Sequence, residues 1–434
     1  MKKISITLSS FDGIKGCYCG VGTMAINFIK SINKISELLE DKYQIDWFIL
    51  SPDYQKSALG YNEKVLNNNL DILSKNNGKI IYYDDGSDGL IAYGYIPQWN
   101  KTSKSVANII LNFYKNYDYN IVFMNETPYV DVVKYVNYDY EKENIAFIYN
   151  VHGTCLIHQR YEKIDTQKKD WEMSIDKYSK EYNNFYLGYI SNYIKKHLIE
   201  DFNIKEEKLI PIINGIFLHN EKYQNKKSDI SILQKYELNF NNKIIISFGR
   251  PEFYKGFHIL IDSLNLLNRN DFSLVLQLPP YDNNTQNVYL DLIKEKLSNS
   301  KFNYLLLEHF EDNFISNLIK FKNTKLVVVP SLAEPFGLIP VEVRMLASET
   351  GAITLVSNKD GLVEQIEDNI DGFIGNIENL IEFSEKINFI LDLEENRISQ
   401  IRNYGYNKVL ESYDYEKNLF KTISLILEKE GLYL

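Results

Sequence analysis

The sequence has little cysteine, no long apolar run and no excess of positive charge. Three cysteines among 434 residues, Cys17, Cys19 and Cys155, are too few for a disulfide framework, so we expect a reducing, cytoplasmic setting. No stretch of 18 or more apolar residues is present, which predicts that no segment spans a membrane. The 48 Lys and Arg residues are outnumbered by 58 Asp and Glu residues. The formal net charge of -10 argues against nucleic acid as the main partner.

What the sequence does contain is a repeated alternation of short apolar runs with longer stretches of helical periodicity. Hydrophobic residues make up 44% of the chain, enough for a large folded core. The alternation is typical of parallel sheets covered by helices, so we predict an α/β fold. The predicted strands are residues 3–9, 45–50, 79–83, 120–125, 145–151, 185–190, 209–213, 243–248, 273–278, 304–307, 325–329 and 353–357. The main predicted helices are residues 22–39, 101–114, 192–201, 256–267, 313–320 and 338–347. We interpret the charged residues 158–184 as a solvated amphipathic helix, with a binding surface as the alternative.

A polar stretch rich in Lys and Asn, residues 219–229, divides this alternation into two halves. Such a composition is typical of a linker between domains. We therefore predict two doubly wound, Rossmann-like domains, residues 1–218 and 230–412, that face a central cleft. Residues 413–434 carry apolar side chains at helical spacing and predict a final amphipathic helix.

Two glutamates after the predicted strand 325–329 give the most specific chemical signal. Glu334 opens the segment Glu-Pro-Phe-Gly, and Glu342 follows eight residues later, just beyond Pro340 at the predicted start of a helix. Carboxylates are strong acceptors for sugar hydroxyls, and the helix N-terminus between them offers N–H groups to a diphosphate. The alternative is that both glutamates are solvated residues at an ordinary strand-to-helix turn.

Cations and glycines follow other predicted strands. Arg250 and Lys255 come after the strand 243–248, where the alternative is an exposed pair that binds no ligand. Gly20 and Gly22 belong to a glycine-rich segment between the first strand and the first helix. Glycines there would let backbone N–H groups approach a phosphate.

A histidine and two cysteines complete the candidates. His152 follows the predicted strand 145–151, and we favour a functional histidine over a structural one at this strand end. Cys17 and Cys19 lie in the glycine-rich segment, where further zinc ligands at suitable spacing are missing. We therefore interpret both thiols as bystanders and expect no metal site.

These segments together resemble the retaining glycosyltransferases of the GT-B fold, most closely family 4. Glu334 and Glu342 match the E-x7-E motif of that family, and Arg250 with Lys255-Gly256 matches its Arg and Lys-Gly segment. The resemblance covers most of the chain and is strong over residues 243–372. It departs from the family pattern at Asp360-Gly361, where the family has a glycine pair.

The resemblance implies a role for each matching residue. Glu334 contacts hydroxyls of the donor sugar and Glu342 contacts the ribose, while Arg250 and Lys255 neutralise the diphosphate without a metal. The residues between the two glutamates, Phe336, Gly337 and Leu338, also bind the donor. Gly20 and Gly22 touch the donor diphosphate and sugar, and His152 contacts the donor sugar.

The implied activity is the transfer of a sugar, with retention of configuration, from a nucleotide diphosphate sugar such as UDP-glucose. The acceptor is unidentified and can be a glycan, a lipid, a protein or a small natural product, and no cofactor is expected. The resemblance assigns residues 1–218 to the acceptor and 230–412 to the donor, with residues 413–434 crossing back onto the first domain. Two other classes stay open: a catalytically silent GT-B protein that binds a glycosyltransferase, and a nucleotide-sugar epimerase or glycan phosphorylase on the same fold.

Overall fold

The chain folds into two units, each built around its own sheet. The computed structural model describes residues 1–58, 60–87, 89, 96–225, 227–280, 287–311 and 313–432. One unit comprises Met1–Phe217 and Tyr415–Leu434, and the other comprises Leu218–Asp414. Residue 226 of the predicted linker and the last two residues of the predicted final segment lie outside the described residues.

The first unit has a seven-stranded sheet in the order β3-β2-β1-β4-β5-β6-β7. All neighbouring strands are parallel. Every residue of β4 and β5 is buried, as expected where helices cover both faces of a parallel sheet. The strands are β1 (Lys2–Ser9), β2 (Tyr43–Pro52), β3 (Gly78–Tyr83), β4 (Tyr119–Asn125), β5 (Ile145–Val151), β6 (Phe185–Tyr189) and β7 (Leu209–Pro211).

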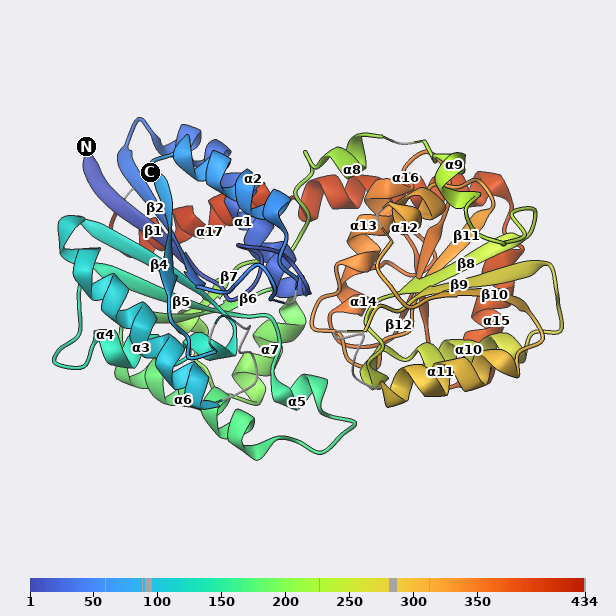
Figure 1. Ribbon diagram of the computed structural model, residues 1–434, viewed down its shortest axis with the longest axis horizontal. Coiled ribbons are helices and arrows are strands. Elements are labelled where there is room, and N and C mark those ends of the chain that lie inside the picture. Colours follow the sequence, from blue (N-terminus) through green and yellow to red (C-terminus); the bar gives the residue numbers. More distant parts are fainter. Residues whose placement is uncertain are drawn as a thin grey trace. The chain divides into compact units, whose positions relative to one another are not determined.

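Helices cover both faces of this first sheet (Figure 1). The faces are covered by α1 (Gly20–Leu39), α2 (Glu63–Ser74) and α17 (Tyr415–Lys429) on one side and by α3 (Ile96–Phe113), α4 (Val132–Val136) and α6 (Thr166–Glu181) on the other. The final helix α17 packs against α1, so the end of the chain lies with its beginning. The shorter helices α5 (Cys155–His158) and α7 (Asn192–Glu200) follow β5 and β6.

The second unit has a six-stranded sheet in the order β10-β9-β8-β11-β12-β13, again parallel throughout. Its strands are β8 (Lys243–Phe248), β9 (Phe272–Gln277), β10 (Asn303–Leu307), β11 (Thr324–Val329), β12 (Ile353–Ser357) and β13 (Phe373–Gly375). One core cluster of this unit packs Leu274, Leu276 and Leu326 against Phe257 and Ile387. These contacts bury the apolar faces of two helices against the sheet.

The helices of the second unit also lie on both faces of its sheet (Figure 1). They are α8 (Glu221–Gln224), α9 (Ile230–Leu233), α10 (Phe257–Asn265), α11 (Val288–Ser298), α12 (Phe314–Ile319), α13 (Ile339–Leu346), α14 (Leu362–Gln365), α15 (Leu380–Leu391) and α16 (Glu395–Ser412). Contacts join α10 to α11 and α15, and α13 to α12, α14 and α16. The predicted fold class, two doubly wound Rossmann-like α/β sheets, is therefore confirmed.

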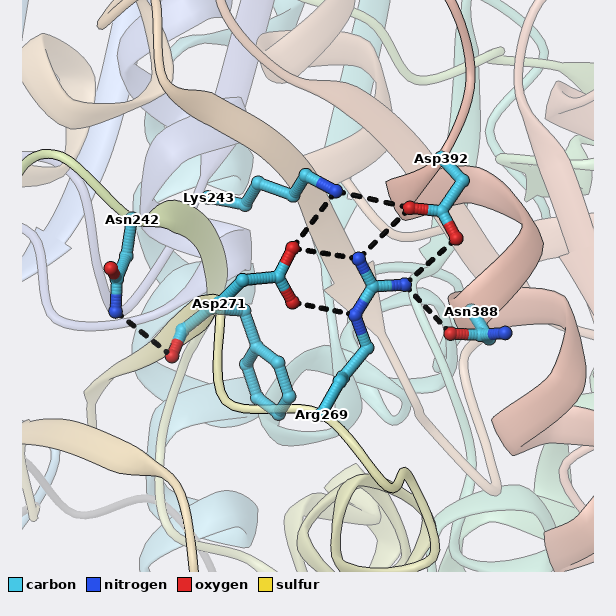
Figure 2. Close-up of polar contacts among 7 residues, drawn as sticks. Asn242, Lys243, Arg269, Asp271, Asn388 and Asp392 are labelled. Carbon is cyan, nitrogen blue, oxygen red and sulfur yellow. Dashed lines mark hydrogen bonds and ion pairs between the residues drawn. The ribbon is translucent and has the colours of Figure 1, made fainter.

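A charged network ties the amino ends of the second sheet to helix α15 (Figure 2). The guanidinium of Arg269 bonds both Asp271, just before β9, and Asp392, just after α15, at 2.7–2.9 Å. Lys243, the first residue of β8, lies 3.0 Å from each carboxylate. This network fixes the edge of the sheet opposite to the carboxyl ends of its strands.

None of the helices within the described residues is long and apolar enough to cross a membrane.

Candidate functional site

The carboxyl ends of β8 and β11 form the centre of the candidate site. The strand order of the second sheet reverses between these two neighbouring strands, and open α/β sheets bind ligands where such a reversal occurs. The segment after β8 carries Arg250 and Lys255, and the segment after β11 carries Glu334. A backbone bond of 2.7 Å from Leu332 N to Tyr254 O joins the two segments.

A glycine allows this close approach. Gly256 has a φ of +68°, in the left-handed region that favours glycine. A Cβ atom at this position would lie 2.0 Å from the carbonyl oxygen of Pro330, which is far inside van der Waals contact. Gly256 therefore lets the turn that carries Lys255 pack directly against the end of β11.

Lys255 and Glu334 form an ion pair in this position. The Nζ atom of Lys255 lies 2.6 Å from Oε2 of Glu334, with 20% and 15% of the two side chains exposed. The hydroxyl of Ser331 lies 3.4 Å from the same oxygen. Burial lowers the pKa of Lys255, but Glu334 and Tyr254 together more than offset this, so the pKa lies above its ordinary value. Lys255 therefore stays an ammonium ion at neutral pH.

Arg250 adds a second cation beside this pair. It follows β8 directly, and its positive charge is close enough to Lys255 to oppose the rise in the pKa of that lysine. Because Glu334 balances the charge of Lys255, these three side chains together carry one net positive charge, which favours an anion at this sheet edge.

The loop of Glu334 is also held from the neighbouring strand β12. The Asp360 carboxylate accepts a 2.9 Å bond from the N–H of Glu334, and the N–H of Gly361 donates to the Glu334 carbonyl at 3.0 Å. Asp360 has a φ of +50°, an uncommon conformation for a residue other than glycine. The departure from the family pattern at Asp360-Gly361 thus coincides with a bond that fixes Glu334.

The predicted donor-binding residues Phe336, Gly337 and Leu338 lie between β11 and α13. The side chain of Phe336 is buried, with its ring centroid 5.8 Å from that of Tyr413. The amide of Gln365 donates to the carbonyls of Phe336 and Gly337, at 2.5 and 2.8 Å. Leu338 is half-buried and immediately precedes α13. Any contact of Phe336 with a ligand would therefore involve main-chain atoms.

Glu342 lies in the first turn of α13 and has partners that the sequence analysis did not predict. Its Oε1 atom accepts bonds from Nζ of Lys222 at 2.7 Å and from the hydroxyl of Tyr223 at 3.3 Å. Both partners belong to α8, inside the stretch interpreted as a linker. Their polar surroundings in the sequence gave no signal of this contact.

The glycine-rich loop of the first unit is organised around a buried aspartate that the sequence analysis missed. The carboxylate of Asp12 accepts bonds from the N–H groups of Gly13, Tyr18 and Cys19, at 2.8–3.3 Å. Burial raises the pKa of Asp12, and these bonds only partly oppose the rise. The loop thus satisfies several of its own N–H groups with a carboxylate of the chain.

The two glycines predicted to bind the donor differ in their surroundings. A Cβ atom at Gly22 would lie 2.3 Å from Oδ2 of Asp12, so this glycine is needed for packing inside the loop. Gly20 is exposed at the start of α1, and a Cβ there would have nothing within 4 Å. Gly20 therefore keeps open space at the helix N-terminus, where backbone N–H groups favour an anion.

The cysteines of this loop have partners within it. The thiol of Cys19 donates to Oδ2 of Asp12 at 3.0 Å, and all three cysteines of the chain are free thiols. Within the described ranges of residues no group of three or more His, Cys, Asp or Glu side chains is placed to hold a metal ion.

His152 directly follows β5 in the first unit. Its Nε2 atom is shielded from solvent and has no hydrogen-bond partner in the described part of the chain. Burial lowers the pKa of His152 to about 4, so the imidazole is neutral at physiological pH. A shielded nitrogen without a partner is costly unless a ligand bonds it, which marks His152 as a candidate ligand contact.

A protein family matches most of the second unit. The family described as glycosyl transferases group 1 matches residues 229–408. These residues are thus similar to the glycosyl transferases group 1 family, and the matched range includes Arg250, Lys255, Glu334 and Glu342.

Individual proteins similar to the chain carry glycosyltransferase names. An uncharacterized glycosyltransferase of Methanocaldococcus jannaschii is 27% identical over 188 residues, 42% of this chain and 45% of that protein. The chain thus spans less than half the length of the curated relatives it matches.

Solved structures match nearly the whole chain. Sucrose-phosphate synthase from Thermosynechococcus elongatus has a TM-score of 0.73 at 14% identity, covering 98% of this chain and 99% of that one. HepE of Anabaena, in complex with UDP and glucose, has a TM-score of 0.67 at 16% identity with the same coverage. These likenesses show that the two units have the GT-B fold.

Proposed function

We propose that this chain is a retaining glycosyltransferase that moves a sugar from a nucleotide diphosphate sugar, UDP-glucose or a close relative, to an acceptor. The observation that carries the proposal is the Lys255–Glu334 pair beside Arg250 at the reversal of the second sheet. The group 1 family match over residues 229–408 supports the reaction class. The complex of HepE with UDP and glucose supports the choice of donor.

Arg250 and Lys255 have the chemistry required for the leaving group. When the bond between the sugar and the diphosphate breaks, negative charge accumulates on the diphosphate. Cations that are already fixed there stabilise the transition state more than the ground state. Lys255 is held in place by its bond to Glu334, so little reorganisation is needed. We propose that these two cations replace a divalent metal.

Glu334 and Glu342 are proposed to hold the two sugar rings of the donor. Glu334 is fixed by Lys255 and through its backbone by Asp360, which sets its carboxylate for hydroxyls of the transferred sugar. Glu342 lies in the first turn of α13 and is assigned to the ribose. Attack by the acceptor on the face next to the departing diphosphate would retain the configuration and would need no enzyme nucleophile.

Residues of the first unit are assigned to the same donor by their chemistry. The neutral imidazole of His152 can donate or accept a bond with a sugar hydroxyl. Gly20, at the open N-terminus of α1, is assigned to the donor diphosphate. Gly22 is assigned to the donor diphosphate as well, because it lets the loop pack closely around Asp12. The free cysteines fit a cytoplasmic enzyme, which is part of the same proposal.

The experiment that tests the proposal follows the fate of UDP-glucose. Thermal unfolding of the protein with UDP-glucose, UDP-galactose, GDP-mannose and ADP-glucose first identifies the donor, since a ligand at 100 times its Kd stabilises by about 2.7 kcal/mol. The stabilising donor is then incubated with candidate acceptors, and NMR reports the anomeric configuration of the product. The α-linked donor should give an α-linked product together with nucleoside diphosphate.

Three results would contradict the proposal. They are the absence of stabilisation by every nucleotide sugar, a product of inverted configuration, and conversion of the donor to an epimer without release of nucleoside diphosphate. The glutamate variant Glu295→Gln, on the exposed surface of α11, serves as the control for changes in Glu334.

A further inference from the structure

The carboxylate of Glu342 is held at one oxygen only. Its Oε1 atom accepts the bonds from Lys222 and Tyr223, at 2.7 and 3.3 Å. At Oε2 no hydrogen bond is recorded to any of the residues that the structure describes, and the side chain is 20% exposed. One edge of this carboxylate is therefore fixed, and the other has no hydrogen-bond partner among the described residues.

The two residues that hold Glu342 are themselves fixed by α8. Asn220 caps this helix, and its side chain accepts a bond from the N–H of Lys222 at 3.2 Å. Tyr223 is buried at 2% exposure, and the ammonium of Lys222 lies 4.9 Å from the centre of its ring. Burial, with the nearby Glu342 carboxylate, raises the pKa of Tyr223 well above its ordinary value, so the hydroxyl keeps its proton and donates.

We propose that Lys222 and Tyr223 are positioning residues that set the Glu342 carboxylate for the ribose of the donor. They fix Oε1 so that Oε2 accepts bonds from the ribose hydroxyls. This inference rests on the proposed function, which assigns Glu342 to the ribose. A carboxylate fixed before binding loses less conformational entropy when the ligand arrives, which favours affinity. Under this proposal α8, in the segment that the sequence analysis interprets as a linker, contributes to donor binding.

A competing arrangement makes the opposite prediction. If the ammonium of Lys222 occupied the place that the ribose needs, its removal would free Glu342 and strengthen binding. If α8 served only to pack against α13, removal of the Lys222 ammonium would weaken the binding of every ligand to the same extent. A pair of ligands that differ only in the ribose hydroxyls separates these cases from the proposal.

The test is calorimetric titration of the full chain with UDP and with 2′,3′-dideoxyuridine diphosphate. For wild type, UDP should bind more tightly than the dideoxy compound. Lys222→Met should weaken UDP about tenfold, the effect expected for a lost bond to a charged group, and leave the dideoxy compound unchanged. Tyr223→Phe should act in the same direction with a smaller effect, and Lys222→Arg should restore most of the affinity for UDP.

The control variant is titrated with the same two ligands. Lys235→Met, at an exposed lysine of the same unit, should bind both compounds like wild type. Tighter binding of UDP by Lys222→Met, or an equal loss for both compounds in a variant that melts like wild type, would overturn the inference alone. Failure of the wild-type protein to bind UDP or any other nucleoside diphosphate would overturn the proposed function, and this inference with it.

Discussion

Lys255 and Glu334, which are 79 residues apart in the sequence, form a 2.6 Å ion pair where the second sheet reverses its strand order. Both side chains are largely shielded from solvent. Their positions are fixed by separate features: Gly256 packs the Lys255 turn onto β11, and Asp360 holds the backbone of Glu334. The positions of both residues are therefore fixed by the protein itself, which is the condition under which charged groups contribute most to a reaction.

Glu334→Gln should leave a folded protein with little activity. The amide keeps the shape of the side chain but loses the charge that pairs with Lys255 and that we propose bonds the donor sugar. We expect turnover of UDP-glucose, with water as acceptor, to fall by about 10²–10³-fold, as for other lost electrostatic contacts to a reacting group. Release of UDP measures this rate, and Glu295→Gln should retain it. A folded Glu334→Gln with wild-type turnover would remove Glu334 from the site.

Arg250→Ala should lower turnover without changing the response to chelators. Because we assign the charge of the leaving diphosphate to Arg250 and Lys255, EDTA should have little effect on the wild-type rate. Arg250→Lys, which keeps the charge but not the planar fork, should recover part of the activity. Loss of wild-type activity in EDTA, with recovery on adding manganese or magnesium, would show that a metal ion neutralises the leaving diphosphate.

His152 should remain neutral throughout the physiological pH range. Burial lowers its folded pKa to about 4 from an ordinary value of 6.5. Its contribution to stability is therefore complete above pH 6.5 and is lost as the pH falls from 6.5 towards 4. The NMR signal of the His152 ring, assigned from its loss in His152→Gln, should stay constant between about pH 5.5 and 8. A titration midpoint near 6.5 would contradict this.

Arg269→Met should reduce stability at neutral pH and much less in acid. Hydrogen bonds from Arg269 hold the pKa of Asp271 below its ordinary value and lower the pKa of Asp392 to about 2. Since both folded pKa values are lowered, the stabilisation is present above the ordinary pKa and is lost as the pH falls through the folded values. Both carboxylates are about half exposed, so screening limits the effect to about 1 kcal/mol.

Urea unfolding at neutral pH and near pH 3 measures this difference. The gap between wild type and Arg269→Met should be largest at neutral pH and shrink in acid. A gap that is the same at both values would mean that Arg269 stabilises the edge of the sheet by packing and not through its charge.

The strands could be predicted well because buried parallel strands give uninterrupted apolar runs. The predicted bounds of β5, β8 and β12 are those of the structure. The prediction missed β13, a strand of three residues that ends in a glycine. Residues 158–184, interpreted as one amphipathic helix, contain the last residue of α5 and the whole of α6 (Thr166–Glu181).

The composition of the site could be predicted, but its internal contacts could not. Arg250, Lys255 and Glu334 could be chosen from the sequence because each lies within a few residues of a predicted strand end. The bonds of Glu342 to Lys222 and Tyr223 span 120 and 119 residues, and no local pattern records them. The same holds for Asp360, whose bond to Glu334 depends on a left-handed backbone at an aspartate.

The central claim is that the Lys255–Glu334 pair binds the diphosphate sugar. Calorimetric titration of UDP-glucose into wild type, Lys255→Met and the exposed-surface control Lys301→Met tests it most directly. The account predicts saturable binding to wild type and control, and at least about tenfold weaker binding to Lys255→Met because the cation at the diphosphate is lost. Equal affinity of UDP-glucose for all three proteins would contradict it.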